Sequence, residues 1–133
     1  MKWLRRAGLA ILSLPALLVF ALIFFEIFGM CVNHAATGRQ TKLLRQNLTR
    51  EIPDIEILDT YSETGNTSGT GNHVDCLSVV TFSTGLTEDD VTAALSRCYS
   101  FDEWDCFVEQ DDDGTFRFRL RTQAPFADNI AGH

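Results

Sequence analysis

An uncharged stretch of 19 residues, 7–25, limits what this chain can fold into more than any other feature. At helical rise it would reach roughly 29 Å, close to the thickness of the hydrocarbon core of a bilayer. Pro15 is tolerable in such a helix, and Glu26 follows where a carboxylate can reach the headgroups. A small soluble domain has no use for a helix that is apolar all round. The sequence therefore predicts an uncleaved signal-anchor, a transmembrane helix over residues 7–28 whose partner is the lipid bilayer.

The two alternatives to a retained anchor are a cleaved signal peptide and a bacterial lipoprotein. A cleaved signal peptide has a shorter apolar core, about 7–15 residues, and an A-x-A-like site. The nearest candidate sites end at Ala35 or Ala36, where Asn33 or His34 takes the place of a small residue. A bacterial lipoprotein has a small residue before its acylated cysteine, whereas Met precedes Cys31 here. A retained anchor fits the sequence better than either alternative.

The charges flanking the anchor bear on its orientation. Three basic residues lie on each side, namely Lys2, Arg5 and Arg6 before it and Arg39, Lys42 and Arg45 beyond it. The first set is much closer to the apolar stretch, and basic residues next to a span favour the cytoplasmic side. We therefore expect the N-terminus in the cytoplasm and the rest of the chain outside it.

The charge of the chain is unevenly distributed. Residues 1–30 contain three basic residues and one acid, which leaves 8 of the 11 basic and 17 of the 18 acidic residues in 31–133. A balance of −9 there is a poor match for the phosphate backbone, so we expect no nucleic-acid partner. No cofactor fingerprint or tight metal-ligand spacing is found, and we predict neither a cofactor nor a metal.

Hydrophobic periodicity divides the chain into five parts. We expect a basic tail (1–6), the anchor (7–28), a juxtamembrane linker (29–38), a soluble α+β domain (39–123) and a loose C-terminal tail (124–133). Within the domain, Leu44, Leu48 and Ile52 predict an amphipathic helix over 41–52 that ends at Pro53. Alternating and β-branched residues predict strands over 54–61 and 73–84, joined by a flexible loop over 62–72.

The second half of the domain has the clearest local signals. Thr87 predicts a helix N-cap, with Asp90 three residues later and an apolar stripe to follow. The run 112–114 ends in Gly114 and predicts a three-residue hairpin loop. That loop pairs Glu109 with Arg117 and Asp105 with Arg121 on one face, and directs the apolar residues to the other: Trp104, Cys106, Val108, Phe116, Phe118 and Leu120.

The predicted order of elements, α-β-β-α-β-β, indicates a small two-layer domain. Two helices on one face of a four-stranded antiparallel sheet would bury a single core. The expected fold class is therefore α+β, an N-terminal transmembrane helix followed by this two-layer domain.

Three cysteines fall on predicted inward faces: Cys76, Cys98 and Cys106. Outside the cytoplasm two of them could form a disulfide, either Cys98–Cys106 or Cys76–Cys106. The alternative is that all three are buried thiols that act as small apolar residues. The sequence leaves these alternatives open.

Two polar loops are the candidate interaction sites. The first is the glycine-rich loop, with Gly65, Asn66, Gly69, Gly71 and Asn72, and the second is the acidic hairpin tip, with Asp111, Asp112 and Asp113. Loops on rigid sheets often carry binding functions, although both runs also suit simple turns. We find no assembled catalytic set, so our first hypothesis is a non-catalytic interaction or ligand-binding module with a protein partner. The alternatives are a membrane-tethered thiol-dependent enzyme, a hydrolase or redox protein, and a structural subunit of a membrane complex.

Overall fold

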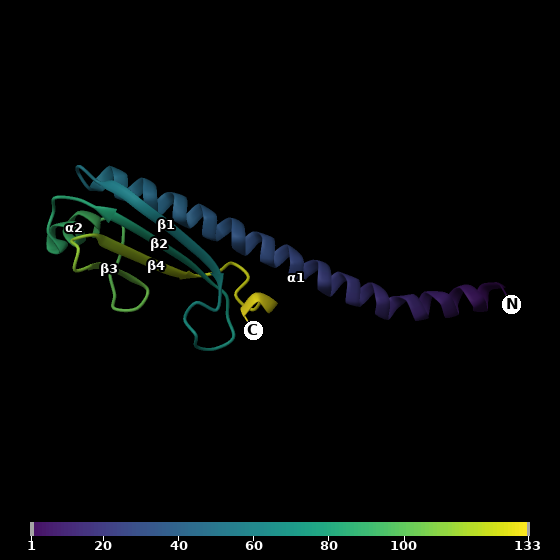
Figure 1. Cartoon of the computed structure of the whole chain (residues 1–133). Helices are drawn as coiled ribbons and strands as arrows, with labels where there is room; N and C mark the ends of the chain where they lie inside the picture. The colour runs from purple at the N-terminus through teal and green to yellow at the C-terminus, as the bar shows by residue number, and fades with distance from the viewer. Residues whose placement is uncertain (1, 133) are drawn as a thin grey trace.

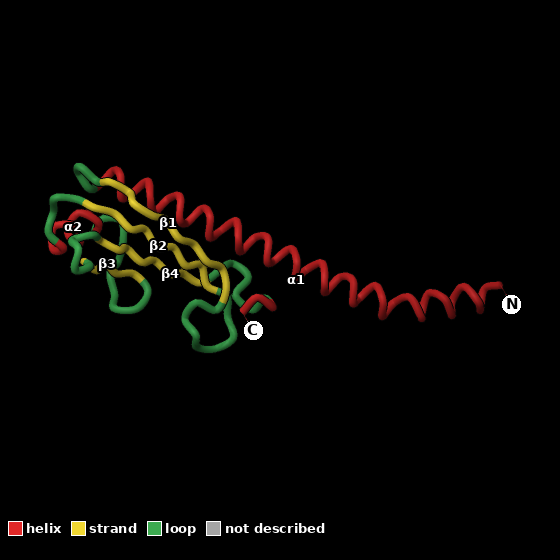
Figure 2. Tube along the Cα trace, in the orientation of Figure 1, coloured by secondary structure: helices red, strands yellow, loops and turns green. Residues whose placement is uncertain are grey.

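One helix of 50 residues, α1 (Lys2–Glu51), runs along a four-stranded sheet and then extends far beyond it (Figure 1). The computed structural model describes the backbone of residues 2–132 and the side chains of residues 13–132. The other elements are β1 (Glu56–Gly65), β2 (Asp75–Ser83), α2 (Glu88–Leu95), β3 (Cys106–Gln110), β4 (Phe116–Gln123) and the 3₁₀ turn η1 (Ile130–Gly132). The sheet is antiparallel in the order β1-β2-β4-β3 (Figure 2). The α+β fold expected from the sequence is confirmed.

The helix α1 joins two segments that the sequence separated. Residues 29–38, expected as a linker, are helical, so the apolar stretch and the amphipathic helix at 41–52 form one continuous element. A buried stripe follows one side of it at helical spacing and consists of Asn33, Thr37, Thr41, Leu44, Leu48 and Ile52. Its first three members are polar, and for that reason an apolar pattern found only the last three.

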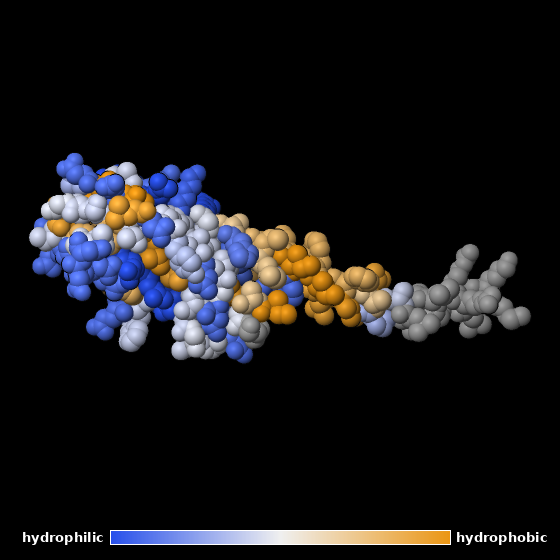
Figure 3. Space-filling view, in the orientation of Figure 1, coloured by the Kyte–Doolittle hydropathy of each residue, from blue (hydrophilic) through white to orange (hydrophobic). Residues whose placement is uncertain are grey.

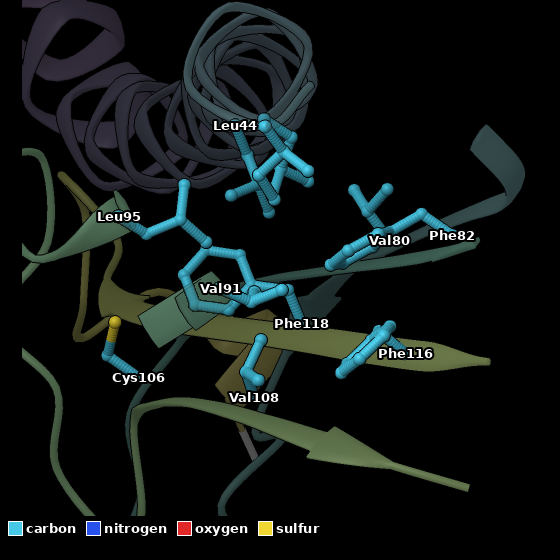
Figure 4. Packing of buried hydrophobic residues seen from close by; sticks show 11 residues of the cluster. Leu44, Val80, Phe82, Val91, Leu95, Cys106, Val108, Phe116 and Phe118 are labelled. Carbon is cyan, nitrogen blue, oxygen red and sulfur yellow. The ribbon is translucent and has the colours of Figure 1, made fainter. Parts of the chain in front are cut away.

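The core lies between the helices and one face of the sheet (Figure 4). It joins Leu44 and Leu48 of α1, Val91 and Leu95 of α2, and the inward side chains of three strands: Val80, Phe82, Cys106, Val108, Phe116 and Phe118. Phe82 and Phe116 stack across β2 and β4 with ring centroids 5.5 Å apart. Both helices therefore cover the same face, and the Thr87 hydroxyl accepts the N-cap hydrogen bond from the Asp90 N–H as expected.

The hairpin β3–β4 has the register that the sequence predicted. Val108 pairs with Phe118, Cys106 with Leu120 and Glu109 with Arg117. Gly114 has a positive φ of 85°, which a glycine adopts without strain and which closes the three-residue loop.

The expectation for Trp104 was wrong, because its side chain is 73% exposed rather than inward. The strand begins only at Cys106. The Asp102 carboxylate accepts hydrogen bonds from the backbone N–H groups of Trp104 and Asp105, at 2.7 and 2.6 Å, and this turn removes Trp104 from the strand pattern.

The first strand and the C-terminal segment also differ from expectation. β1 extends to Gly65 because its last residues pair with β2, so the loop between the two strands begins later than residue 62. The segment 124–132 is packed rather than loose. The N–H of Val74 donates to the Ala127 carbonyl at 2.8 Å, and the N–H of Ala124 donates to the Val74 carbonyl at 3.0 Å.

The part of α1 from residue 13 to residue 28 extends beyond the sheet and has an apolar surface (Figure 3). Within residues 13–51 it is long and apolar enough to cross a membrane, a criterion that a signal sequence also meets. A core helix meets it too, but hardly any of the 18-residue apolar window within this range is buried. The side chains of residues 7–12 of the expected anchor lie outside the described ones.

Candidate functional site

The two candidate loops lie at opposite ends of the sheet. Gly65 pairs with Asp75, and Asp75 pairs with Gln123, at the end nearer the apolar half of α1. Gln110 pairs with Phe116 at the other end, where the acidic tip follows. A single binding surface cannot include both loops.

The glycine-rich loop is held in shape by one of its own side chains. The Asn66 amide donates to the Gly71 carbonyl at 2.7 Å, and its oxygen accepts from the Gly69 N–H at 3.1 Å. Gly69 and Gly71 both have φ of 69°, a conformation that suits glycine. Asn66, Gly69 and Gly71 therefore determine the shape of the loop, while Asn72 lies exposed beside them.

An open polar cavity of about 510 Å³ lies between this loop and the ends of β2 and β4. Its walls are Ser68, Thr70, His73, Asp75, Asp105, Arg121, Thr122 and Gln123. None of the residues expected to form an interaction loop lines the cavity. Alternation along the expected strand over 73–84 would direct His73 and Asp75 to one face, and this spacing is the signal in the sequence for the site, although β2 itself begins at Asp75.

Each charged side chain of the cavity wall lies beside a polar partner. Asp75 is only 4% exposed, and its Oδ1 lies 3.2 Å from Nε2 of His73. Thr67 donates to the other carboxylate oxygen at 3.4 Å. Arg121 donates from Nε to Asp105 at 2.6 Å on the opposite wall. The cavity therefore offers hydrogen-bond donors and acceptors, and both a guanidinium and carboxylates, to a polar ligand or a partner side chain.

The geometry of Ser68, His73 and Asp75 does not match a hydrolytic triad. The Ser68 hydroxyl lies 3.4 Å from Nε2 of His73, the same nitrogen that contacts Asp75. A triad uses the two ring nitrogens separately, one toward the nucleophile and the other toward the carboxylate. The arrangement can bind polar groups, but it does not relay a proton from Ser68 to Asp75.

The cysteines are free thiols in different surroundings. Cys76 is 2% exposed and faces the Asn33 carbonyl, whereas Cys98 is partly exposed and accepts a hydrogen bond from Arg50 at 3.5 Å. Burial raises the pKa of Cys106 to about 11, with the nearby Asp102 and Asp105 carboxylates adding to the effect.

A disulfide among these cysteines stays a prediction, but the order of the strands excludes one of the two expected pairings. Cys76 is on β2 and Cys106 on β3, with β4 between them. Two strand spacings separate their backbones by about 10 Å or more, beyond the reach of roughly 7 Å between bridged Cα atoms. Cys98–Cys106 is therefore the pairing to test.

The acidic tip is stabilised as a turn. Oδ1 of Asp113 accepts from the N–H and the hydroxyl of Thr115, at 2.9 and 2.7 Å, and these bonds lower the pKa of Asp113. Arg117 donates to Asp111 at 2.8 Å and to Glu109 at 3.0 Å, while Asp112 is exposed. Among residues 13–132, no three acidic, histidine or cysteine side chains cluster as a metal site would require.

No protein-family model matches the chain, and neither the curated proteins nor the solved structures include a match to it.

Proposed function

We propose that this chain is a single-pass membrane protein that holds a small acidic interaction module outside the cytoplasm, close to the bilayer. The module is non-catalytic in this proposal, and its polar cavity receives a partner group. The helix would serve as the anchor and the sheet as a rigid support for the glycine-rich loop.

The surface of α1 is the main support for the membrane anchor. Eleven large apolar side chains between Leu14 and Phe28 are each at least 50% exposed. Monomeric soluble proteins rarely leave so large an apolar surface in water, and a lipid bilayer would cover it on all sides.

The orientation can be tested by labelling intact cells with a membrane-impermeant maleimide. The background would be Cys31→Ser with Cys98→Ser, because Cys31 is an exposed native thiol and Cys98 a partly exposed one. We expect Asp112→Cys, at the exposed hairpin tip, to be labelled without permeabilisation, and Lys2→Cys to require it. The reverse labelling pattern would show the opposite topology. Recovery of the chain without detergent would contradict the membrane anchor.

The polar cavity is a better candidate for the contact site of a partner than the acidic hairpin tip. Thr37 of α1 contacts Thr64 near the end of β1 at 2.6 Å, and Thr37 lies nine residues after Phe28. At helical rise this places the cavity end of the sheet about 14 Å beyond Phe28, the last residue of the expected anchor. A partner at the membrane surface would meet this end of the module first, whereas the acidic tip points away.

Site-specific photo-crosslinking in native membranes tests the cavity as the contact site. We expect a cross-linker at Thr70 to give a discrete adduct, which Arg121→Ala in the cavity wall removes. A cross-linker at Asp112, on the acidic tip, is the matched control and should give none. An adduct from Asp112 alone would move the contact to the other end of the sheet.

The thiol-enzyme alternative depends on Cys98. It is the partly exposed cysteine of the module and the one that Arg50 contacts, whereas Cys76 and Cys106 are buried. Loss of an activity on Cys98→Ser would favour this alternative over a binding role.

A further inference from the structure

The C-terminal segment lies against α1 where the apolar stretch ends. The ring of Phe126 contacts Phe25 and Phe28 edge-on, with centroids 5.5 and 5.9 Å apart. Gly29 permits this approach, because a Cβ there would lie 2.9 Å from the Asn129 amide nitrogen and 3.2 Å from Phe126. The segment is therefore packed onto the helix at the level of residues 25–29.

The same segment surrounds the acidic residue at the end of the apolar stretch. The Glu26 carboxylate accepts from the Asn129 amide at 2.8 Å and from the Ile130 N–H at 3.0 Å. Asn129 itself is buried. A carboxylate near hydrocarbon is costly unless donors satisfy it, and here the protein supplies two of them.

Apolar side chains of the segment continue the surface of the helix. Ile130 is 61% exposed, and Phe25 and Phe28 beside Phe126 are exposed as well. Pro125 is also exposed at the start of the segment. The helix and the segment together form an apolar rim, defined here as Phe25, Phe28, Phe126 and Ile130.

We propose that this rim is a second membrane contact, in which Phe126 and Ile130 enter the boundary between the headgroups and the acyl chains of the bilayer that α1 crosses. This inference rests on the proposed anchor. It adds a docking element that sets the depth and the tilt of the module relative to the lipid surface.

A lipid surface is the occupant because the rim is continuous with the apolar stretch and lies at its end. The uncharged residues 7–25 span about 29 Å, so a bilayer that covers them ends near Phe25. Interfacial segments typically place apolar side chains just inside that boundary and polar groups toward the water. Glu26 and Asn129 then face each other at the boundary, where the carboxylate needs donors.

Depth-dependent fluorescence quenching of the full chain in phosphatidylcholine vesicles tests this proposal. The background is Trp3→Phe with Trp104→Phe, so that a single new tryptophan reports its own depth. Ile130→Trp is the main probe, because its side chain is exposed and the change leaves the Phe126 contacts in place. Phe20→Trp on the apolar helix reports the anchor. The native Trp104 in the Trp3→Phe chain, which lies two residues before β3 and outside the rim, reports the module itself.

We expect lipids brominated near the headgroup to quench Ile130→Trp more than lipids brominated near the chain ends. The opposite order is expected for Phe20→Trp, and no quenching for Trp104. An unquenched Ile130→Trp beside a quenched Phe20→Trp overturns the second contact and leaves the anchor standing. Stronger quenching of Ile130→Trp by the deep label also overturns the boundary placement. An unquenched Phe20→Trp overturns the anchor and, with it, this inference.

Discussion

Asn33 hydrogen bonds to both backbone groups of Phe126, a residue 93 positions later in the chain. Its amide nitrogen donates to the Phe126 carbonyl at 2.9 Å, and its oxygen accepts from the Phe126 N–H at 2.9 Å. The buried side chain thus pairs with the segment as a neighbouring strand would. This pair holds the C-terminal segment against α1 and explains why a polar residue occupies the buried stripe of the helix.

We expect Asn33→Ala to lower the free energy of unfolding by about 1–3 kcal/mol, since it leaves both backbone groups of Phe126 without their partner. Pulse proteolysis in urea, on the full chain in detergent, measures the change. His34→Ala, at the next and exposed position, should stay within about 0.5 kcal/mol of the parent chain. Equal effects of the two changes would contradict the role of the pair.

The buried apolar half of the same stripe offers a second comparison between neighbours. Leu44 is fully buried in the core, whereas Leu43 is about half exposed. Leu44→Ala should cost about 2–5 kcal/mol through lost burial and the cavity left behind, while Leu43→Ala should cost less than about 1 kcal/mol. The same urea titration distinguishes them, and a larger loss for Leu43→Ala would mean that another face of α1 packs on the sheet.

The turn before β3 predicts a pH dependence. Hydrogen bonds from the backbone N–H groups of Asp105 and Trp104 lower the pKa of Asp102 below its ordinary value of 3.8. A carboxyl group with a lowered folded-state pKa contributes stability above its unfolded-state pKa and loses that stability as the pH falls through the folded-state pKa. Unfolding measured from pH 5 to pH 2 should therefore show a smaller loss for Asp102→Asn than for the parent chain. Glu103→Gln is the control and should follow the parent.

The thiols should differ in their rate of alkylation at pH 8 under reducing conditions. Cys31 and Cys98, which are exposed and partly exposed, should react first. Cys106, with a pKa raised to about 11, stays protonated at that pH, and the thiolate is the reactive form. Peptide mass mapping measures the order, and full labelling in urea shows that all four are accessible once unfolded. Fast labelling of Cys106 in the folded chain would contradict its burial.

A disulfide is checked in the same peptide maps without reductant. The sheet order predicts that a disulfide involving Cys106 links it to Cys98 and not to Cys76. A Cys76–Cys106 peptide would contradict the order of strands.

The sequence predicted elements whose signals are local. The apolar stretch, the Thr87 cap and the 112–114 turn depend on residues within a few positions of one another, so periodicity and turn chemistry were enough to place them. The register of β3 and β4 followed as well, because only one loop length put charges opposite charges.

Only the tertiary structure decided the features that depend on distant partners. Thr37 and Asn33 are polar, and a helical stripe of polar residues predicts a face that lies in solvent. In the structure these two residues instead hydrogen bond to Thr64 and Phe126. The polar cavity joins the loop after β1 to the ends of β2 and β4, and no local pattern brings His73 near Arg121. Hydrogen bonds to residues far away in the chain satisfy the buried polar side chains of α1. A sequence pattern does not reveal which distant group supplies each hydrogen bond.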